Sequence, residues 1–212
     1  MTGDARIKTG ITFAVAATAL AWAAGFFLAR SRPVLSPLTG PVAFAAMGVD
    51  GGAARPLSSG ELLGRPYVAD FVFTRCGGPC PRLSSNMAAL QKRLPAAVRL
   101  VSFTVDPDND TPDVLAAYAE RHGAQAGRWL FARLEARELF ELVNAGYHLP
   151  VYIDPKAEPA SRAIHSTKMV LVDAQGRVRG YYDGRAPGGL DALGRDAMRV
   201  SSEGPRAGRD DV

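Results

Sequence analysis

Two cysteines separated by three residues are the side chains of this sequence best suited to chemistry. Cys76 and Cys80 stand in "FVFTRCGGPCPRLSSNM", the segment from Phe71 to Met87. The glycines and the proline at positions 77–79 leave the loop flexible enough for the two sulfur atoms to form a disulfide or to converge on a metal ion. The spacing therefore fits a structural disulfide, a redox pair or half of a metal site.

Other uses of such a cysteine pair fit the sequence less well. A structural disulfide across so short a loop removes little entropy from the unfolded chain, so it would stabilise the fold only weakly. Covalent haem attachment needs a histidine directly after the second cysteine, where this chain has Pro81. A zinc ribbon needs four ligands, and only three histidines accompany the two thiols. A redox pair and a metal site completed by a histidine are the stronger interpretations.

The three histidines differ in their context. His122 stands beside Gly123 at the end of a predicted helix, where a histidine commonly meets free backbone carbonyls. His148 lies in a polar and aromatic loop and carries little signal by itself. His165 falls in "AIHSTKMVLVD", directly before a predicted late strand, and strand pairing in a mixed sheet would bring that loop beside the cysteines. We therefore predict that His165 is the third ligand.

The predicted ligands are two thiolates, from Cys76 and Cys80, and the imidazole of His165. This is a soft set of low coordination number, which suits Cu(I), can accommodate Cu(II) and suits magnesium or calcium poorly. Zinc with an open fourth position also fits two cysteines and a histidine. Copper is the preferred interpretation, and zinc remains an alternative.

The elements around the cysteines follow from short local patterns. "YVADFVFT", from Tyr67 to Thr74, is typical of a buried central strand. A helix should follow it, because Pro81 is favoured at the first helical position and the apolar residues after it recur on one face. Cys80 would then lie at or near the N-cap, where the helix dipole lowers the pKa of a thiol. The sequence thus predicts reactive thiols.

Further along the chain, strand and helix patterns alternate. Val98–Val105 reads as a second buried strand, and a helix follows with Thr111 as N-cap, Pro112 at the first position and Gly123 as terminator. The pattern at Lys168–Asp173 predicts a strand that forms a hairpin with the segment after it. Buried strands alternating with helices predict an α/β fold with a mixed central sheet flanked by helices.

The N-terminal part contains 19 uncharged residues, Ile11–Ala29, with basic residues on both sides. A helix of this length reaches about 28 Å, which is close to the hydrocarbon thickness of a bilayer. We predict an uncleaved transmembrane signal anchor, with a cleaved signal peptide as the alternative. The predicted division of the chain is a cytoplasmic tail at 1–10, the anchor at 11–29, a proline-containing tether at 30–41, a domain at 42–200 and a disordered tail at 201–212.

Charge adds two expectations about the surroundings of the protein. A weak asymmetry of basic residues places the N-terminus inside a bacterial inner membrane, with the domain facing the periplasm or the cell exterior, an oxidising compartment. The 25 lysines and arginines and the 21 aspartates and glutamates are interspersed, without the basic stripe that nucleic-acid binding usually shows. We therefore expect a membrane-anchored protein without a nucleic-acid partner.

Three segments together resemble a known family. "FVFTRCGGPCPRLSSNM", "VSFTVDPDNDTPDVLAAY" and "IHSTKMVLVDAQGRVRGYYDG" are similar to the signature segments of the Sco/SenC family of membrane-anchored copper proteins, and the resemblance covers residues 43–198. It implies a thioredoxin-like fold and one copper ion bound by Cys76, Cys80 and His165. It also implies delivery of copper, or reduction of cysteines, at the dinuclear copper centre of cytochrome c oxidase.

Two further features bear on this resemblance, the residues before His165 and the aspartate Asp106. The family often has an acidic residue just before the histidine, but Ala163 and Ile164 precede His165 here, so that partner of the imidazole is absent. Asp106, in "VDPD", resembles the acidic loop residue that the family places near the copper. An Asp-Pro turn explains Asp106 equally well.

Two functions remain open at this stage. The first is a copper metallochaperone whose partners are the copper-binding subunit of the oxidase and another periplasmic copper chaperone or thiol reductase. The second is an enzyme, a thiol-disulfide oxidoreductase that uses Cys76 and Cys80 as its redox pair. A reductase would normally show two cysteines separated by two residues and a facing proline, whereas this chain has a longer spacing and offers His165. The sequence favours the chaperone and leaves enzymatic activity undecided.

Overall fold

The computed structural model describes residues 35–153 and 163–203. Within these ranges, no helix combines the length and the apolar character needed to cross a bilayer. The predicted anchor at 11–29 lies outside the described residues, as does the last part of the predicted C-terminal tail.

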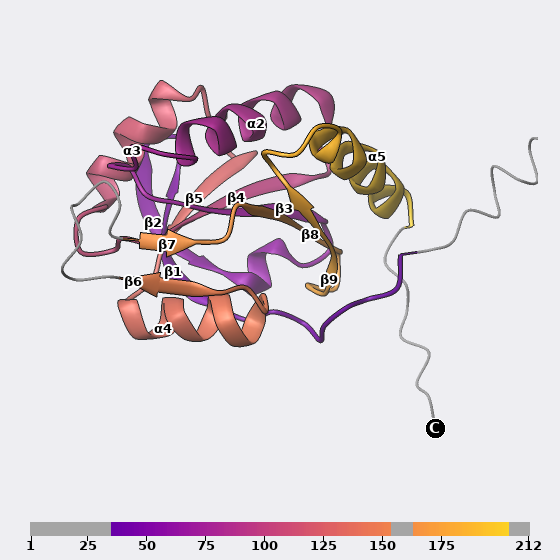
Figure 1. The fold of residues 1–212 in the computed structure, drawn as a ribbon, viewed down its shortest axis with the longest axis horizontal. Coiled ribbons are helices and arrows are strands. Elements are labelled where there is room, and N and C mark those ends of the chain that lie inside the picture. Colours follow the sequence, from indigo (N-terminus) through magenta and orange to yellow (C-terminus); the bar gives the residue numbers. More distant parts are fainter. Residues whose placement is uncertain (1–34, 154–162, 204–212) are drawn as a thin grey trace, which may run out of the picture. The chain divides into compact units, whose positions relative to one another are not determined.

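A seven-stranded sheet forms the centre of the fold, with the strand order β2-β1-β5-β4-β3-β8-β9 (Figure 1). The middle strands β3, β4 and β5 run parallel, while β1 and β8 join them antiparallel, so the predicted mixed sheet is confirmed. The strands are β1 (Ala45–Asp50), β2 (Ala53–Ser58), β3 (Tyr67–Val72), β4 (Arg99–Thr104), β5 (Trp129–Arg133), β8 (Lys168–Val172) and β9 (Val178–Asp183), and the two-stranded sheet beside them is β6 (Val151–Ile153) with β7 (Ala163–His165).

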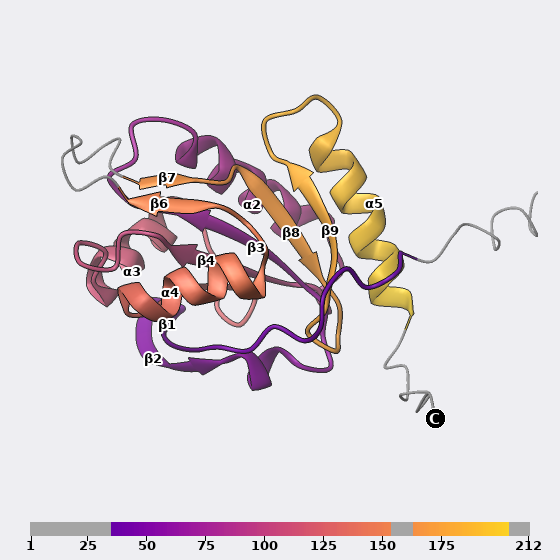
Figure 2. The ribbon, with the colours of Figure 1, turned by 60° about the horizontal axis from the view of Figure 1, so that its bottom comes forward.

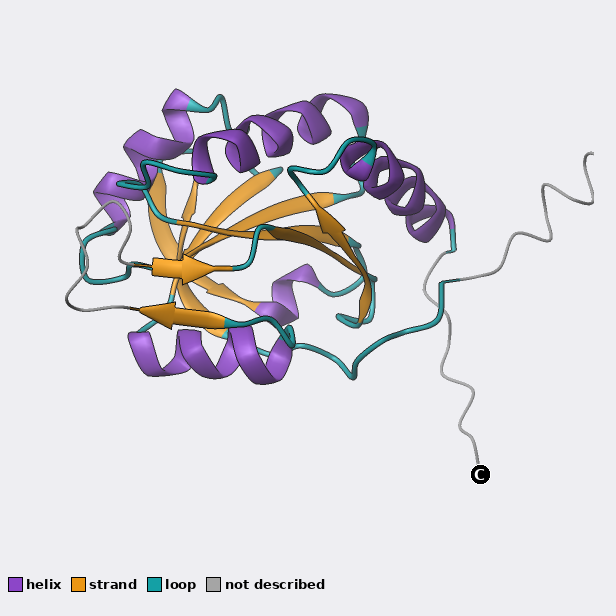
Figure 3. Cartoon of the chain, viewed as in Figure 1, coloured by secondary structure: helices purple, strands orange, loops and turns teal. Residues whose placement is uncertain are grey.

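Helices cover both faces of the sheet, as expected. One face carries α2 (Cys80–Arg93), α3 (Pro112–Arg121) and α5 (Gly189–Ser202), and the opposite face carries α4 (Ala136–Glu141), which continues into a π-helical turn at Leu142–Gly146 (Figures 2 and 3). A short 3-10 helix at Ser59–Leu62 precedes β3. The strands expected from buried apolar runs are present, and β3 ends two residues earlier than predicted.

The two ends of α3 confirm the start and stop signals predicted from the sequence. Thr111 is the N-cap, and its side chain accepts a hydrogen bond from the backbone N–H of Val114. Pro112 is the first helical residue. Gly123 follows the C-cap with a φ of +68°, a left-handed conformation that glycine adopts without a steric penalty.

Aromatic side chains fill the core between the sheet and the π-helical turn. The rings of Phe71 and Phe103 stack with centroids 5.7 Å apart, and Tyr147 meets Phe71 edge-on at 5.3 Å. The hydroxyls of Tyr67 and Tyr147 share a buried hydrogen bond of 3.0 Å. Every residue of β3 is buried, so this strand is a fixed base for the loop that follows it.

The pairing of β3 with β8 defines two ends of the sheet. Their antiparallel register joins Tyr67 to Val172 and Ala69 to Val170. The start of β8 therefore lies beside the end of β3, where the cysteine loop begins, and we call this the cysteine end. The start of β3 lies beside the turn between β8 and β9, and we call this the hairpin end. The six residues of β3 separate the two ends by about 20 Å.

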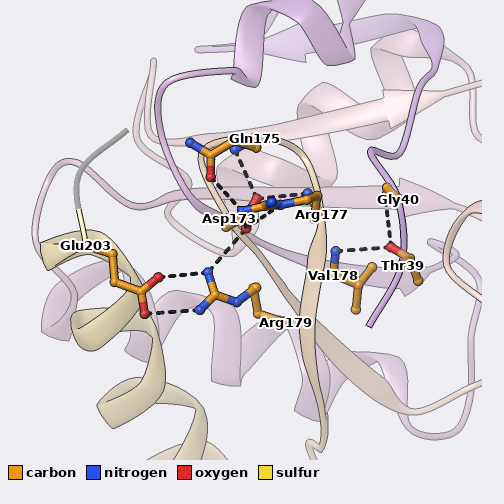
Figure 4. Close-up of polar contacts among 8 residues, drawn as sticks. All are labelled: Thr39, Gly40, Asp173, Gln175, Arg177, Val178, Arg179 and Glu203. Atoms are coloured by element: carbon orange, nitrogen blue, oxygen red, sulfur yellow. Dashed lines mark hydrogen bonds and ion pairs between the residues drawn. The ribbon is translucent and has the colours of Figure 1, made fainter. Parts of the chain in front are cut away.

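At the hairpin end, the chain that leads into the domain is bound to β9. The N–H of Leu38 donates to the carbonyl of Val178 (2.7 Å), and the N–H of Val42 donates to the carbonyl of Gly176 (2.8 Å). The N–H of Val178 donates to Oγ1 of Thr39 (3.2 Å) (Figure 4). The last residues of the predicted tether are thus part of the fold. At the other terminus, α5 continues to Ser202, which is two residues into the predicted tail.

Candidate metal centre

The two cysteines occupy different environments within one loop. The chain leaves the sheet after β3, turns so that the N–H of Cys76 donates to the carbonyl of Phe73 (3.3 Å), and enters α2 at Cys80. Cys76 is half-buried and is followed by exposed glycines, whereas Cys80 is 0% exposed. No disulfide joins them, but their side chains are in hydrogen-bonding contact. The structure therefore brings the two predicted thiol ligands together, one accessible and one enclosed.

The prediction that the helix start lowers the pKa of Cys80 is wrong for this structure. Pro79 is the N-cap, and Cys80 is already the first helical residue, packed into the core. Burial raises the pKa of the Cys80 thiol well above its ordinary value, and the contact with Cys76 and the charge of Asp70 act in the same direction. Desolvation of a thiolate outweighs the helix dipole because full burial can shift a pKa by about 3–5 units, whereas the dipole contributes about 2 kcal/mol at most.

A buried polar chain lies on the same face of the sheet as α2. The side chain of Asp70, in the middle of β3, accepts a 2.5 Å hydrogen bond from the hydroxyl of Ser102, which in turn accepts one of 2.9 Å from the indole N–H of Trp129. All three residues are buried. Asp70 is the one charged residue of the buried segment "YVADFVFT", and its charge helps to raise the pKa of Cys80.

The first turn of α2 is also tied to α3. The hydroxyls of Ser84 and Tyr118 lie 2.7 Å apart in a buried hydrogen bond. Burial raises the pKa of Tyr118 to about 12, so the phenol stays protonated and can donate this bond. Ser84 is one helical turn after Cys80, and the contact therefore fixes the part of the helix that carries the buried thiol.

Asp106, the acidic residue singled out in the sequence, contacts the residue next to Cys76. Its carboxylate pairs with the guanidinium of Arg75 at 2.9 Å and accepts a 2.7 Å hydrogen bond from the amide of Asn109. Its backbone carbonyl also accepts bonds from the N–H groups of Asn109 and Asp110, which agrees with the turn interpretation. A role for Asp106 beside a bound metal stays a prediction.

Asp110 was missed by the sequence analysis and is the more deeply buried of the two aspartates. It is 0% exposed, and it receives hydrogen bonds from Thr74 and Thr104, which end or follow the neighbouring parallel strands β3 and β4. A signal for it exists in the sequence: "FT" occurs at or just after the end of both strands, and an aspartate stands directly before the helix N-cap. Burial raises the pKa of Asp110, while the threonine hydrogen bonds oppose the rise.

His165, the predicted third ligand, is the last residue of β7, where its backbone pairs with Val151. Its side chain lies outside the described part of the structure. β8 begins three residues later beside the end of β3, so the topology places the backbone after His165 at the cysteine end, as predicted. Among the side chains that are described, no three histidine, cysteine, aspartate or glutamate groups are arranged to hold a metal ion.

The other two histidines lie in separate surroundings. His122 is the C-cap of α3, its ring lies 4.5 Å from that of Tyr118, and burial lowers its pKa. This agrees with its expected place at a helix end. His148 is exposed and adopts a φ of +50°, directly after the π-helical turn.

Comparisons with known proteins bear on these features. The SCO1 protein homolog of Bacillus subtilis is 34% identical over 128 residues, which is 58% of this chain and 65% of that protein. A protein of Stutzerimonas stutzeri, provisionally named as copper-binding, is 34% identical over 146 residues, 66% of this chain and 68% of that protein. The chain thus spans about two thirds of the length of these curated relatives.

A solved structure shares the fold. BsSco, in which a disulfide switch was identified and which is a member of the Sco family of cytochrome c oxidase assembly proteins, superimposes with a TM-score of 0.68 at 29% identity, covering 81% of this chain and 99% of that one. The likeness confirms the expected fold of a mixed sheet flanked by helices. The family model described as SCO1/SenC matches residues 44–190, a segment that contains both cysteines and His165. On this match, the chain belongs to the SCO1/SenC family.

Proposed function

We propose that this protein binds one copper ion through Cys76, Cys80 and His165 and passes it to a partner. The observation that carries the proposal is the contact between the two thiols at the cysteine end, beside the strand that follows His165. Two sulfur donors held together, one of them fully buried, favour a soft ion such as Cu(I). The relative from Stutzerimonas stutzeri that is named as copper-binding supports this choice.

The difference between the two cysteines fits a carrier better than a permanent metal site. Cys80 is enclosed and would retain the ion, while Cys76 is half-buried and open to an approaching protein. In a stepwise exchange, an incoming partner ligand would bond to copper as the Cys76 thiolate leaves, and Cys80 would leave last. Such exchange needs a low coordination number, so that a position is open for the first incoming donor.

The proposed partner is the copper-binding subunit of cytochrome c oxidase. BsSco belongs to a family of assembly proteins for this oxidase, and this chain shares that family. We further propose that residues 11–29 anchor the protein in a bacterial inner membrane, with the domain on the periplasmic side. Another periplasmic copper chaperone or a thiol reductase would supply the copper or keep the thiols reduced.

Copper binding can be tested by titrating the full-length reduced protein with Cu(I) in competition with a chromophoric chelator. The wild type should bind one equivalent, Cys76→Ala and Cys80→Ala should lose tight binding, and His165→Ala should weaken it. His122→Ala is the matched control, because this imidazole belongs to the end of α3. Unchanged affinity in both Cys76→Ala and His165→Ala would overturn the copper assignment.

A second function, thiol-disulfide exchange with the cysteines of the oxidase subunit or of another chaperone, is favoured by the same contact between the thiols. Cys76 is the accessible sulfur and would attack a partner disulfide, after which Cys80 would resolve the mixed disulfide. The reduction potential and exchange rate of the pair discriminate the two functions. A strongly reducing disulfide that exchanges slowly with small thiols in both directions would exclude a catalytic role.

A further inference from the structure

Asp110 is a buried carboxylate with hydrogen bonds on both of its oxygen atoms. Oδ1 accepts a bond of 2.6 Å from the hydroxyl of Thr74. Oδ2 accepts one of 3.1 Å from the backbone N–H of Thr74 and one of 2.5 Å from the hydroxyl of Thr104. The residue is 0% exposed, so water does not compete for these bonds.

The position of Thr74 explains what this carboxylate does. The last backbone hydrogen bond between β3 and the segment after β4 joins the N–H of Val105 to the carbonyl of Val72. Beyond it the chain leaves the sheet, and the N–H of Thr74 finds the Asp110 carboxylate where a continuing strand would offer a carbonyl. Asp110 therefore sets the direction in which the chain departs from β3.

Cys76 follows only two residues after this anchored position. Behind it come two exposed glycines, which constrain the backbone little. Cys80 is fixed independently, because it is enclosed at the start of α2. The place of Cys76 relative to Cys80 thus depends on how firmly Thr74 is held.

We infer that Asp110 is a positioning residue that, through Thr74, holds Cys76 at the location where its sulfur meets Cys80 and the bound ion. This inference rests on the proposed function for its copper readout, and it also makes a prediction about the metal-free thiols. The ion pair between Asp106 and Arg75 also contacts this loop, but the pair is partly exposed and includes a flexible side chain. The Asp110 carboxylate is the enclosed anchor.

The test compares Asp110→Ala and Asp110→Asn with Asp173→Asn in the full-length protein. Asp173 is a matched control, because it is 2% exposed and likewise accepts backbone N–H and side-chain hydrogen bonds, but at the hairpin end. The metal-free readout is the rate at which iodoacetamide alkylates Cys76 relative to Cys80, resolved by mass spectrometry. Cu(I) affinity by chelator competition and the midpoint of urea unfolding complete the set.

Asp110→Ala should change the Cys76 to Cys80 alkylation ratio several-fold and lower Cu(I) affinity by about tenfold or more, as loss of a supporting group around a metal site commonly does. Asp110→Asn keeps an acceptor for the Thr74 N–H and should give a smaller change in the same direction. Asp173→Asn should shift the unfolding midpoint and leave the alkylation ratio and the affinity of the folded protein unchanged. The inference is overturned if Asp110→Ala lowers the unfolding midpoint and, like Asp173→Asn, leaves both thiol readouts at the wild-type values.

If Asp110→Ala does not fold, Thr104→Val removes one donor to the carboxylate at nearly constant volume, together with the acceptor of the Asp106 backbone N–H. It should shift the alkylation ratio in the direction seen for Asp110→Asn, and an unshifted ratio in a folded Thr104→Val protein would count against the inference. A wild type that binds no Cu(I) would refute the proposed function alone. The alkylation ratio would still decide the role of Asp110.

Discussion

Two buried aspartates, at opposite ends of the sheet, are held by donors of different charge. Asp110, at the cysteine end, is held by threonine hydroxyls and a backbone N–H. Asp173, at the hairpin end, accepts bonds from backbone N–H groups and pairs with the guanidinium groups of Arg177 (2.9 Å) and Arg179 (3.2 Å) (Figure 4). The two ends therefore bury similar carboxylates but compensate for their charge differently.

Paired charges stabilise the hairpin end. Arg179 is itself 3% exposed in its side chain, and it reaches on to the carboxylate of Glu203 after the end of α5 (2.9 Å). One guanidinium thus joins the β8–β9 turn to the last helix, close to where Thr39 binds the backbone of Val178. Buried charges that are paired and hydrogen-bonded in this way hold one arrangement of the chain, because separating them leaves unpaired charges in the core.

Among the described residues, the groups that donate hydrogen bonds to Asp110 at the cysteine end are all uncharged. Burial raises the pKa of Asp110, although three hydrogen bonds from uncharged groups oppose the rise. Cys80, which is also buried, has a raised pKa for the same leading reason. Groups whose pKa is shifted by burial are common at functional sites, so the presence of Asp110 and Cys80 at one end of the sheet supports the assignment of the site to that end.

The largest expected effect comes from removing the cation at the hairpin end. Arg179→Met leaves Glu203 without this buried partner and takes one of two guanidinium groups from Asp173. We expect the free energy of unfolding to fall by roughly 3–5 kcal/mol, measured by urea denaturation. Cu(I) affinity of the folded protein should not change, because the cysteines lie at the other end.

Arg137→Met serves as the control for this prediction. Arg137 pairs with Glu141 on the surface of α4, and its side chain is 90% exposed. Loss of such a pair should alter the free energy of unfolding by about 0.5 kcal/mol or less. Equal losses in the two variants would show that the Arg179 cluster does not hold the hairpin end as described.

A smaller effect, with a defined dependence on pH, is expected at the cysteine end. Because the pKa of Asp110 is raised above its ordinary value of 3.8 in the folded protein, folding favours the protonated carboxyl. The resulting stabilisation is fully present below pH 3.8 and is lost as the pH rises through the folded-state pKa. Asp110→Asn cannot titrate, so the wild type should gain stability relative to this variant when the pH falls from 7 to 3.

Urea unfolding of both proteins across this pH range checks the sign. All other groups titrate in both proteins, so their contributions cancel in the difference between the two free energies of unfolding. A difference that is constant with pH, or that moves in favour of Asp110→Asn on acidification, would contradict the raised pKa.

The parts of the fold that could be predicted depend on local signals. The helix caps at Thr111 and Gly123 and the buried runs that form β3, β4 and β8 were read correctly, because each pattern is complete within a few residues. The β1–β2 hairpin and β5 were not predicted. β5 is only five residues long, and it becomes a strand through its pairing with β4 and β1, which are distant in sequence.

At the candidate site, too, only features that depend on nearby residues could be predicted from the sequence. The two cysteines were found from their spacing, and their contact is present in the structure. The pKa of Cys80 was predicted in the wrong direction, because its place at a helix start is a local property, whereas its burial depends on how the whole chain packs. Asp110 was missed since its role exists only through Thr74, which is 36 residues away in sequence.

The smallest effect concerns the second contact to the cysteine loop, between Arg75 and Asp106. The side chains are 40% and 11% exposed, so Arg75→Gln should lower the free energy of unfolding by about 1 kcal/mol at most, and less at high salt. If the buried Asp110 is the anchor of Cys76, this variant should change the Cys76 alkylation ratio less than Asp110→Ala does. A change as large as that of Asp110→Ala would mean that the Arg75–Asp106 ion pair and the Asp110 carboxylate position Cys76 together. The loop between β3 and α2 would then need both contacts to hold the sulfur in place.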